Sequence, residues 1–455
     1  MTDHARGFSL RTATFLVVSS TVGGGVLSTS GYVALDVGSN RLMLLLWVIG
    51  GVIAACGALS LAEVSASLPR SGGEFVILSE AYGPLIGFLG GWVSLIFGFV
   101  APIAATGSAA ASYLLSPCGM TGLLPIRNLA TIAIVGFALT HAAGRAHTER
   151  VQGLVTAGTI AALSAFVVAG IWVASPGLAS ITDRPPVLRF PGAAMFVGLI
   201  FVSYAYTGWN GASYVAGEIA DSQRILPLSI LLGTGMVVAL YIGLNAVFAL
   251  AVPIEELRMM ADREGRDSIE RIAAIAARRL FNPPGANAVS LGLGVVLLAS
   301  LSAMLLTGPR VAVAMAREGR MPSFLGRNSR RNETPATATA LVAAGAIVLL
   351  WSGRFEAIVF AAGVGLALNS LLTVAAVYVL RWSQPDLPRP FRVPGYPVLP
   401  AIYLVLTAAS LGFAFVDREQ RLTSLAGLAG VVAGIPVYFL GRRGKPPERP
   451  GSSDL

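Results

Sequence analysis

Charged residues are scarce in this chain of 455 residues. They make up 12% of the sequence, where a soluble domain has about 25%, and hydrophobic residues make up 55%. The mean hydropathy is +0.73. A chain with so little charge and so much apolar surface needs lipid as its solvent, and the composition therefore predicts an integral membrane protein.

Cysteine and histidine are almost absent, which limits the chemistry open to the chain. The two cysteines, Cys56 and Cys118, fall in different segments and suggest neither a disulfide framework nor a thiolate metal site. The three histidines, His4, His141 and His147, supply no catalytic cluster, and no phosphate-binding loop is present. We therefore expect no enzymatic activity, no cofactor, no metal site and no ATP-driven transport.

Long uncharged runs occur throughout the sequence, and each is close to the roughly 20 residues that cross a bilayer. Between residues 81 and 126 the uncharged stretch is too long for one helix, but residues 116–119 supply the turn that divides it. The sequence predicts one all-α integral membrane domain over residues 1–455 with twelve transmembrane helices. Their centres lie near Gly23, Val52, Val100, Val135, Ser164, Tyr204, Val237, Leu301, Ala344, Leu368, Thr407 and Val431.

Basic residues outnumber acidic residues by 32 to 23, but they are scattered over short loops beside the hydrophobic runs. Because they do not gather on one module, a nucleic-acid partner is not expected. An even number of spans places both termini on one side, and the basic residues are more frequent in the loops on that side. The positive-inside rule therefore predicts a multi-pass protein of the cell membrane with cytoplasmic N- and C-termini.

Three consecutive glycines stand in the middle of the first run, within residues 22–26 (VGGGV). Each glycine costs a helix about 1 kcal/mol relative to alanine, so this pattern favours a local unwinding. Unpaired backbone groups are tolerated in a membrane only where they line a cavity or meet a polar ligand. The alternative is a close contact between two helices through small residues.

The sixth run contains a second interruption. Residues 204–211 (YAYTGWNG) place glycines, an amide and a tryptophan at the depth of the membrane centre. The two interrupted runs are five spans apart, which is the pattern produced by an inverted repeat of five helices. We therefore predict that the first and sixth helices are discontinuous and that they enclose a central solute site.

Several short motifs occur in order along the chain. Together they resemble amino-acid permeases of the amino acid-polyamine-organocation superfamily, and most closely its L-type amino-acid transporters. The resemblance implies a LeuT-type fold: inverted repeats at about 10–175 and 190–381, two extra helices at about 395–441, and a cytoplasmic tail at 442–455. The motifs are Ala62-Glu63, residues 68–75, Gly83-Pro84-Leu85, Gly91-Trp92, Gly208-Trp209-Asn210, Glu218, Leu226-Pro227, residues 314–322 and residues 387–394.

The resemblance also places an amino-acid site between the two broken helices. The positive end of a helix dipole and free N–H groups suit a carboxylate, and backbone carbonyls suit an ammonium group. The N–H groups are those of Gly24, Gly25 and Val26. The carbonyls are those of Thr21, Tyr204 and Thr207. Further residues expected at the site are Gly23, Tyr206, Gly208 and Asn210.

Individual roles follow for some of these residues. Tyr204 or Tyr206 could close over the solute, although packing explains either tyrosine equally well. Asn210 could bridge the first and sixth helices, and Trp209 is expected to pack. The family usually has Ser or Thr where Gly24 stands, so one hydroxyl contact to the carboxylate is expected to be missing.

No acid or base lies at the centre of any run, which favours a neutral solute. We therefore expect secondary active transport or exchange of neutral L-amino acids by alternating access. A cationic amino-acid or polyamine antiporter is the alternative within the superfamily, since an aromatic site can hold a cation through ring faces. A channel is the alternative of a different class.

The coupling mechanism is expected to depart from the family. Thr159 aligns with a position where many of these permeases have a lysine, so lysine deprotonation cannot drive proton coupling here. A bound cation could use hydroxyls such as Ser300 or Ser302, but serines within a span more often bond to their own helix. We expect exchange or facilitated transport without obligatory proton symport, with sodium dependence as the alternative.

Two features are expected on the outer side. Residues 269–280 show helical spacing of apolar residues and predict an amphipathic helix, either plugging the entrance or resting on lipid headgroups. Cys118 lies in the loop where eukaryotic L-type relatives carry a cysteine linked to an ancillary glycoprotein. Without the surrounding pattern, such a link is not expected here. The expected partners are therefore the amino acid and membrane lipid.

Overall fold

The computed structural model describes residues 7–119, 124–143, 148–174, 192–327, 334–353 and 355–441. Within these ranges the fold is helical, apart from one isolated bridge between Phe8 and Ile219. The expected tail at 442–455 lies outside the described residues. The same holds for the segment 175–191 between the two expected repeats.

Ten helical segments of the described chain are long and apolar enough to cross a membrane, and two shorter apolar helices join them. All twelve predicted runs coincide with one of these segments. The shorter two are α7 (Ile126–Ala143) and α14 (Ala336–Ser352). The uninterrupted long ones are α3 (Asn40–Ser67), α8 (Thr148–Ala174), α10 (Ser222–Ala251), α13 (Pro283–Arg317), α15 (Phe355–Ser383) and α16 (Val398–Val416).

Four of the ten segments are built from more than one piece. They are α1 with α2 (Leu10–Thr21, Gly24–Val37), α5 with a π-helical turn and α6 (Pro84–Leu95, Ile96–Val100, Ala101–Leu115), α9 with the 3₁₀ segment η4 (Gly192–Tyr206, Gly211–Glu218), and α17 with α18 (Arg421–Val432, Gly434–Gly441). The first and third of these breaks fall where the two glycine-rich sequences predicted them.

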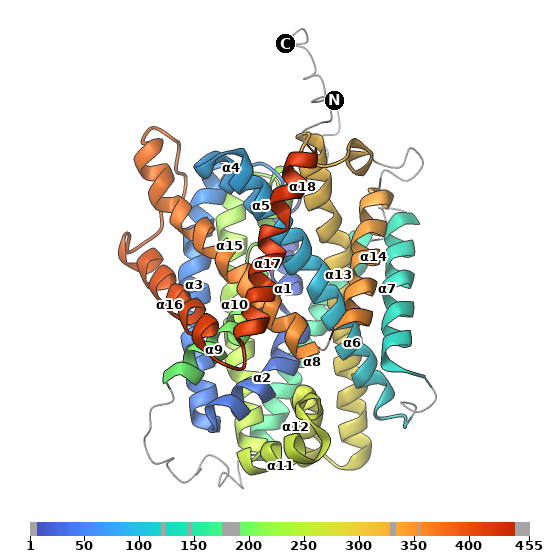
Figure 1. Cartoon of the computed structure of the whole chain (residues 1–455). Helices are drawn as coiled ribbons and strands as arrows, with labels where there is room; N and C mark the ends of the chain where they lie inside the picture. The colour runs from blue at the N-terminus through green and yellow to red at the C-terminus, as the bar shows by residue number, and fades with distance from the viewer. Residues whose placement is uncertain are drawn as a thin grey trace.

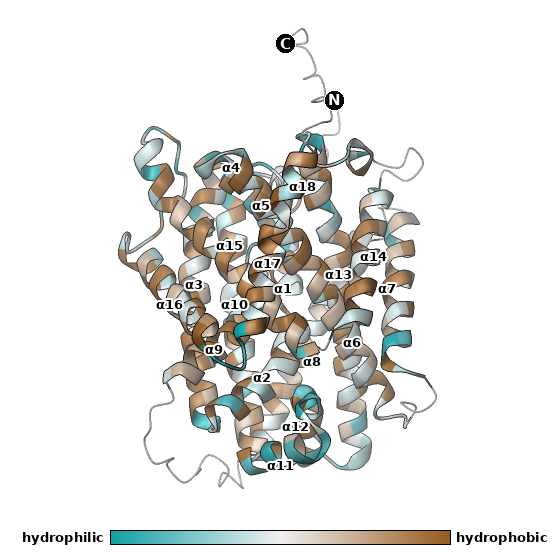
Figure 2. Cartoon of the chain, viewed as in Figure 1, coloured by the Kyte–Doolittle hydropathy of each residue, from teal (hydrophilic) through white to brown (hydrophobic). Residues whose placement is uncertain are grey.

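Short helices lie at the two ends of the bundle (Figure 1). α4 (Glu74–Tyr82) lies at the same end as α18, whereas α11 (Ile254–Glu264) and α12 (Ile272–Leu280) lie at the opposite end. Figure 2 shows hydrophilic residues gathered on α11 and α12, while the helices between the two ends are mostly hydrophobic. The remaining short segments are η5 (Arg266–Arg271) and η6 (Ser323–Gly326).

The predicted amphipathic helix is divided into η5 and α12, and it packs on the protein. Ile269 and Ile272 are buried. A Cβ atom at Gly31 of α2 would lie 2.4 Å from the Ile269 carbonyl oxygen, so the two backbones are in direct contact. The segment therefore rests against α2, and the expectation that it plugs an entrance stays a prediction.

An arginine of the same segment links two transmembrane helices. Arg266 pairs with Asp36 of α2 at 2.8 Å and with Glu356 of α15 at 2.9 Å. Its guanidinium also lies 5.8 Å from the centre of the Tyr32 ring. Together with the Gly31 contact, these ion pairs fasten η5 to α2 and α15 at the α12 end of the bundle.

A buried carboxylate joins helices at the other end. Glu63 of α3 is 2% exposed and accepts two hydrogen bonds from Arg381 of α15, at 2.8 and 2.6 Å. The Val393 N–H donates to the same carboxylate at 2.6 Å, and Arg389 lies 3.8 Å away. The carboxylate therefore ties the segment after α15 to α3.

We predict that Glu63→Gln lowers the midpoint of thermal unfolding in detergent by several degrees, because two arginines lose a buried counter-charge. Breaking a buried pair costs about 3–5 kcal/mol, and we expect the lower end because the Arg381 side chain is 24% exposed. The matched control is Glu80→Gln, whose pair with Arg70 is exposed and worth about 1 kcal/mol at most. Equal shifts for the two variants would contradict the prediction.

Candidate functional site

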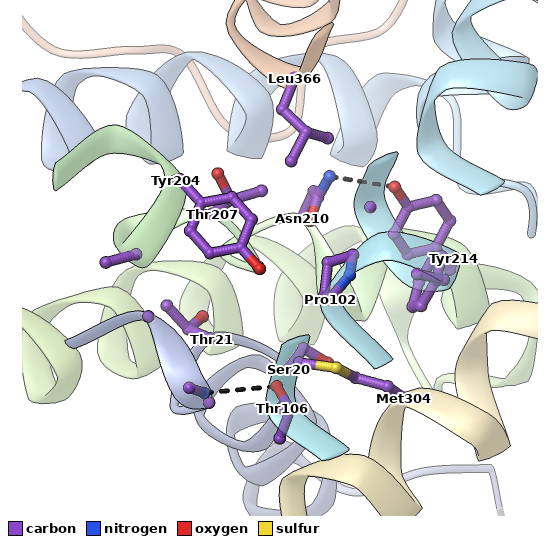
Figure 3. Close-up of a pocket in the computed structure, with 18 residues that line it drawn as sticks. Ser20, Thr21, Pro102, Thr106, Tyr204, Thr207, Asn210, Tyr214, Met304 and Leu366 are labelled. Carbon is purple, nitrogen blue, oxygen red and sulfur yellow. Dashed lines mark hydrogen bonds between the residues drawn. The ribbon is translucent and has the colours of Figure 1, made fainter. Parts of the chain in front are cut away.

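A cavity of about 40 Å³ lies between the two helix breaks (Figure 3). On the same measure one water needs about 10–15 Å³, so the cavity has room for roughly three waters. It is lined by the predicted residues Thr21, Gly23, Gly24, Gly25, Tyr204, Thr207, Gly208 and Asn210. Its other walls include Ser20, Gly98, Phe99, Pro102, Thr106, Ala205, Gly211, Tyr214, Met304 and Leu366.

Two glycines allow the broken helices to approach each other closely. A Cβ atom on Gly25 would lie 2.7 Å from the Ala205 Cα atom, so α2 and α9 touch through their backbones. Gly208 has φ +125°, and a Cβ there would lie 2.5 Å from the Ser20 carbonyl oxygen. Any larger residue at either position must push the helices apart.

Other helices satisfy the carbonyl groups at the first break. The Tyr241 hydroxyl of α10 donates a hydrogen bond to the Thr21 carbonyl at 2.7 Å. The Ser300 hydroxyl of α13 donates to the Val22 carbonyl. Each carbonyl oxygen has a second lone pair, so Thr21 still has capacity to accept a bond from a ligand in the cavity.

The Gly24 N–H donates to the Thr106 hydroxyl at 3.3 Å, shown as a dashed line in Figure 3. Thr106 belongs to α6 and is not among the site residues predicted from the sequence. It places a hydroxyl beside the residue whose own side chain lacks one. The sequence does contain a signal for Thr106. Gly98, Pro102 and Thr106 are spaced four residues apart, which places them on one face of a helix, and all three line the cavity.

The two candidate tyrosines differ in direction. Tyr204 lines the cavity and is 8% exposed. The structure does not bring Tyr206 to it: the Tyr206 hydroxyl donates to the Trp47 carbonyl at 3.0 Å, and its ring packs 5.0 Å from that of Tyr241. Val26 is buried in the first turn of α2, beyond the lining residues.

Asn210 does not bridge the two broken helices as expected. Its amide nitrogen donates to the Tyr214 hydroxyl at 3.0 Å, and that hydroxyl donates to the Glu74 carboxylate at 2.8 Å. The link therefore runs from the cavity to α4, away from α1. The sequence places Glu74 only within the motif at residues 68–75, because its partner Tyr214 in η4 lies 140 residues further along the chain.

A second, smaller cavity of about 20 Å³ lies on the other side of the sixth run's break. Thr207 and Leu366 line both cavities and so divide them. Trp209 belongs to the smaller one, where its ring meets the Tyr403 ring edge-on at 6.4 Å. This contact agrees with the packing role expected for Trp209.

The coupling candidates lie in three different surroundings. Ser300 bonds across to the first break and not to its own helix. Ser302 faces away and lies 2.9 Å from the His141 ring of α7, because residues two apart on a helix point to different sides. Thr159 is buried on α8, a helix that packs against α1. Among the described residues no cluster of three metal-ligating side chains occurs.

Cys118 is exposed and free. It follows α6 near Ser116, whose hydroxyl accepts a hydrogen bond from Arg271 of η5 at 2.7 Å. The cysteine therefore lies at the end of the bundle closed by η5 and α12.

Sequence comparison identifies related proteins. A family profile described as "Amino acid permease" matches residues 8–428. The large neutral amino acids transporter small subunit 2 of Mus musculus is 28% identical over 440 residues, covering 94% of this chain and 79% of that protein. The serine/threonine exchanger SteT of Bacillus subtilis (strain 168) is 28% identical over 431 residues, covering 93% of this chain and 94% of that protein. The Asc-type amino acid transporter 1 of Mus musculus is 27% identical over 444 residues, covering 95% of this chain and 80% of that protein.

We predict that Gly25→Leu abolishes solute uptake into proteoliposomes without preventing membrane insertion. The new side chain would separate α2 from α9 and fill the cavity, whereas the hydrophobicity of the span would not fall. The control is Gly235→Leu on α10, where an added Cβ meets nothing within 4 Å. Uptake is measured after both proteins are shown to be monodisperse, and wild-type uptake by Gly25→Leu would refute the placement of the site.

Proposed function

Because the chain belongs to the amino acid permease family, a family of multi-pass membrane transporters and not of enzymes, we propose that it exchanges neutral L-amino acids by alternating access. The observation that carries this proposal is an uncharged cavity at two helix breaks. The names of the relatives support it, since they describe transporters of large neutral amino acids and a serine/threonine exchanger.

The cavity offers complementary groups for the two charges of an amino acid. The first N–H groups of a helix have no acceptor within that helix, so α2 presents the Gly25 N–H to a carboxylate, while Val26 follows it one residue beyond the lining. The Thr106 hydroxyl, beside Gly24, adds a side-chain donor to this end. The ammonium group is assigned to the carbonyls of Thr21, Tyr204 and Thr207, and the Tyr204 ring to closing over the solute.

The lining explains why we favour a neutral substrate over a cationic amino acid or a polyamine. None of the described residues that line the cavity is charged. A zwitterion balances its own charges, whereas a further ammonium group would meet no counter-charge in this lining, only the aromatic rings of Phe99, Tyr204 and Tyr214. The room for roughly three waters, about 90 Å³ of liquid volume, suits a small side chain.

Ion pairs and hydrogen bonds link elements on both sides of the cavity, which supports a carrier rather than a channel. Arg266 links α2 and α15 at the α12 end. At the other end the Phe8 N–H donates to the Glu218 carbonyl at 2.8 Å, and Glu218 pairs with Arg310 of α13 at 3.4 Å. Links of this kind can break and re-form during an alternating-access cycle, for which a continuous pore is not needed.

The finer architecture is part of the proposal. Twelve spans form a LeuT-type fold, with one inverted repeat over about 10–175, a second over about 190–381, and two extra helices. Both termini lie in the cytoplasm, and α11 and α12 face outward in the cell membrane. The proposed partners are membrane lipid and the transported amino acid. Cys118 is not assigned to a disulfide link with an ancillary subunit.

We predict that esterification or N-acetylation of the amino acid abolishes binding. Either change removes one of the charges that the backbone at the breaks recognises, while it leaves the side chain intact. Competition by the free amino acid, its methyl ester and its N-acetyl derivative is measured against uptake of a radiolabelled neutral amino acid. Undiminished competition by both derivatives would contradict the assignment of carboxylate and ammonium to the helix breaks.

We predict that counterflow needs amino acid on both sides of the membrane and does not need a proton gradient, because Thr159 provides no titratable group on α8. Uptake is measured with sodium, the proton gradient and internal amino acid varied independently. Concentrative uptake driven by protons alone, into vesicles without amino acid, would refute this. If sodium alone drives uptake, the Ser300 region becomes the cation site, and Thr159→Lys should weaken the dependence.

A further inference from the structure

Glu74 is a deeply buried carboxyl group beside the cavity. It is the first residue of α4 and is 1% exposed. Its Oε2 atom accepts hydrogen bonds from the hydroxyls of Tyr214 and Ser94, and Asn369 in turn donates to the Ser94 hydroxyl at 3.5 Å. In the described part of the chain it forms no ion pair. A carboxylate buried among neutral groups is strongly disfavoured unless it binds a proton.

Two hydrogen bonds connect this group to the cavity. Asn210 and Tyr214 both line the cavity. Asn210 donates to the Tyr214 hydroxyl, and Tyr214 donates to Glu74. Figure 3 shows Asn210 and Tyr214 pointing toward each other at the edge of the cavity. A change in η4 on solute binding therefore reaches Glu74 directly.

The segment η4 covers Glu74. The N–H groups of Gly72 and Gly73 donate to the carbonyls of Tyr214 and Ser213, at 3.3 Å each. A Cβ on Gly73 would lie 2.5 Å from the Tyr214 ring, so the cover fits closely. Arg70, two residues before this contact, is exposed. Movement of η4 away from this loop would bring water to Glu74.

The neighbours of Glu74 suit both of its protonation states. The titratable groups that face it are Tyr214 from η4 and Tyr403 from α16, while α5 and α15 present Ser94 and Asn369. Hydroxyl groups can donate to a carboxylate or accept from a carboxyl group. Burial raises the pKa of Glu74 above its ordinary value, which agrees with the lack of a cation.

We propose that Glu74 is a protonation site of the exchange cycle, neutral while η4 covers it and ionised when η4 moves and water enters. This inference rests on the proposed exchange function. On opening, the carboxyl O–H bond breaks and the proton passes to water at the α4 end. On closing, the proton returns from the same side. The site therefore regulates exchange without moving a proton across the membrane.

The sign of the pH effect follows from the return step. The neutral form is the one that fits under η4, so protonation supports closure fully below the ordinary pKa of an exposed carboxyl group, and this support is lost as the pH rises to the raised pKa of the covered group. Exchange should fall as the pH rises between these two pKa values, approaching about tenfold per pH unit for a single group. No such fall is expected where the side chain cannot ionise.

The test measures counterflow of a radiolabelled neutral amino acid in proteoliposomes, with the same pH on both sides and a series of pH values. Wild type should lose activity toward alkaline pH, and Glu74→Gln should show a flat profile, because its amide stays neutral. Glu80→Gln, which changes an exposed acid of the same helix, should keep the wild-type profile. A wild-type slope in Glu74→Gln, or a flat wild-type profile, would overturn the inference.

A second variant decides the matter if Glu74→Gln does not fold. Tyr214→Phe keeps the ring, which packs against Phe99 at 5.3 Å, but removes the donor to the carboxylate. Loss of that donor should move the midpoint of the pH profile to higher pH by about one unit or more, whatever happens to the maximal rate. An unmoved midpoint would refute the role of Glu74. Absence of counterflow in wild type at every pH would instead refute the exchange function.

Discussion

Hydrogen bonding of the backbone in an apolar solvent is the constraint on which the rest of this structure depends. Two interrupted helices leave polar backbone groups in the middle of the bundle, where each unpaired group costs several kcal/mol. Thr106, Tyr241 and Ser300 supply partners for the first break. These residues stand on α6, α10 and α13, so the positions of three other helices follow from the need to satisfy one break.

Close backbone contact has a second consequence, the separation of the cavity from the charged ends. Gly25 and Gly208 bring the broken helices together around the cavity, and Gly31 lets Ile269 seal the α12 end. The charged residues lie at the two ends of the bundle, where they link helices. Arg266 bridges α2 and α15, and Glu63 ties α3 to the segment after α15. Water can replace such ion pairs at the ends of the bundle but not at its centre.

Hydropathy predicted the helices, and the glycine runs predicted both breaks. Both kinds of feature depend on depth in the membrane, and the position of a residue along a hydrophobic run gives that depth. They could not predict the rotation of each helix about its own axis, which decides the side chains that face the site. Tyr206 and Ser302 lie on the expected helices but face Trp47 and His141. Helices buried on all sides have no polar stripe to show which face meets the site. Thr106 and Glu74 were missed for a related reason, since their importance comes from partners far away in the sequence.

Charge balance connects the cavity with the function that we propose for it. A zwitterion carries no net charge, and the described lining of the cavity adds none. The movement of a loaded site across the membrane then transfers no charge, so the membrane potential does no work on it. The nearest carboxyl group, Glu74, lies behind Tyr214 and is most stable there when it holds a proton. A buried acid is therefore compatible with a neutral carrier as long as its proton is exchanged on one side only.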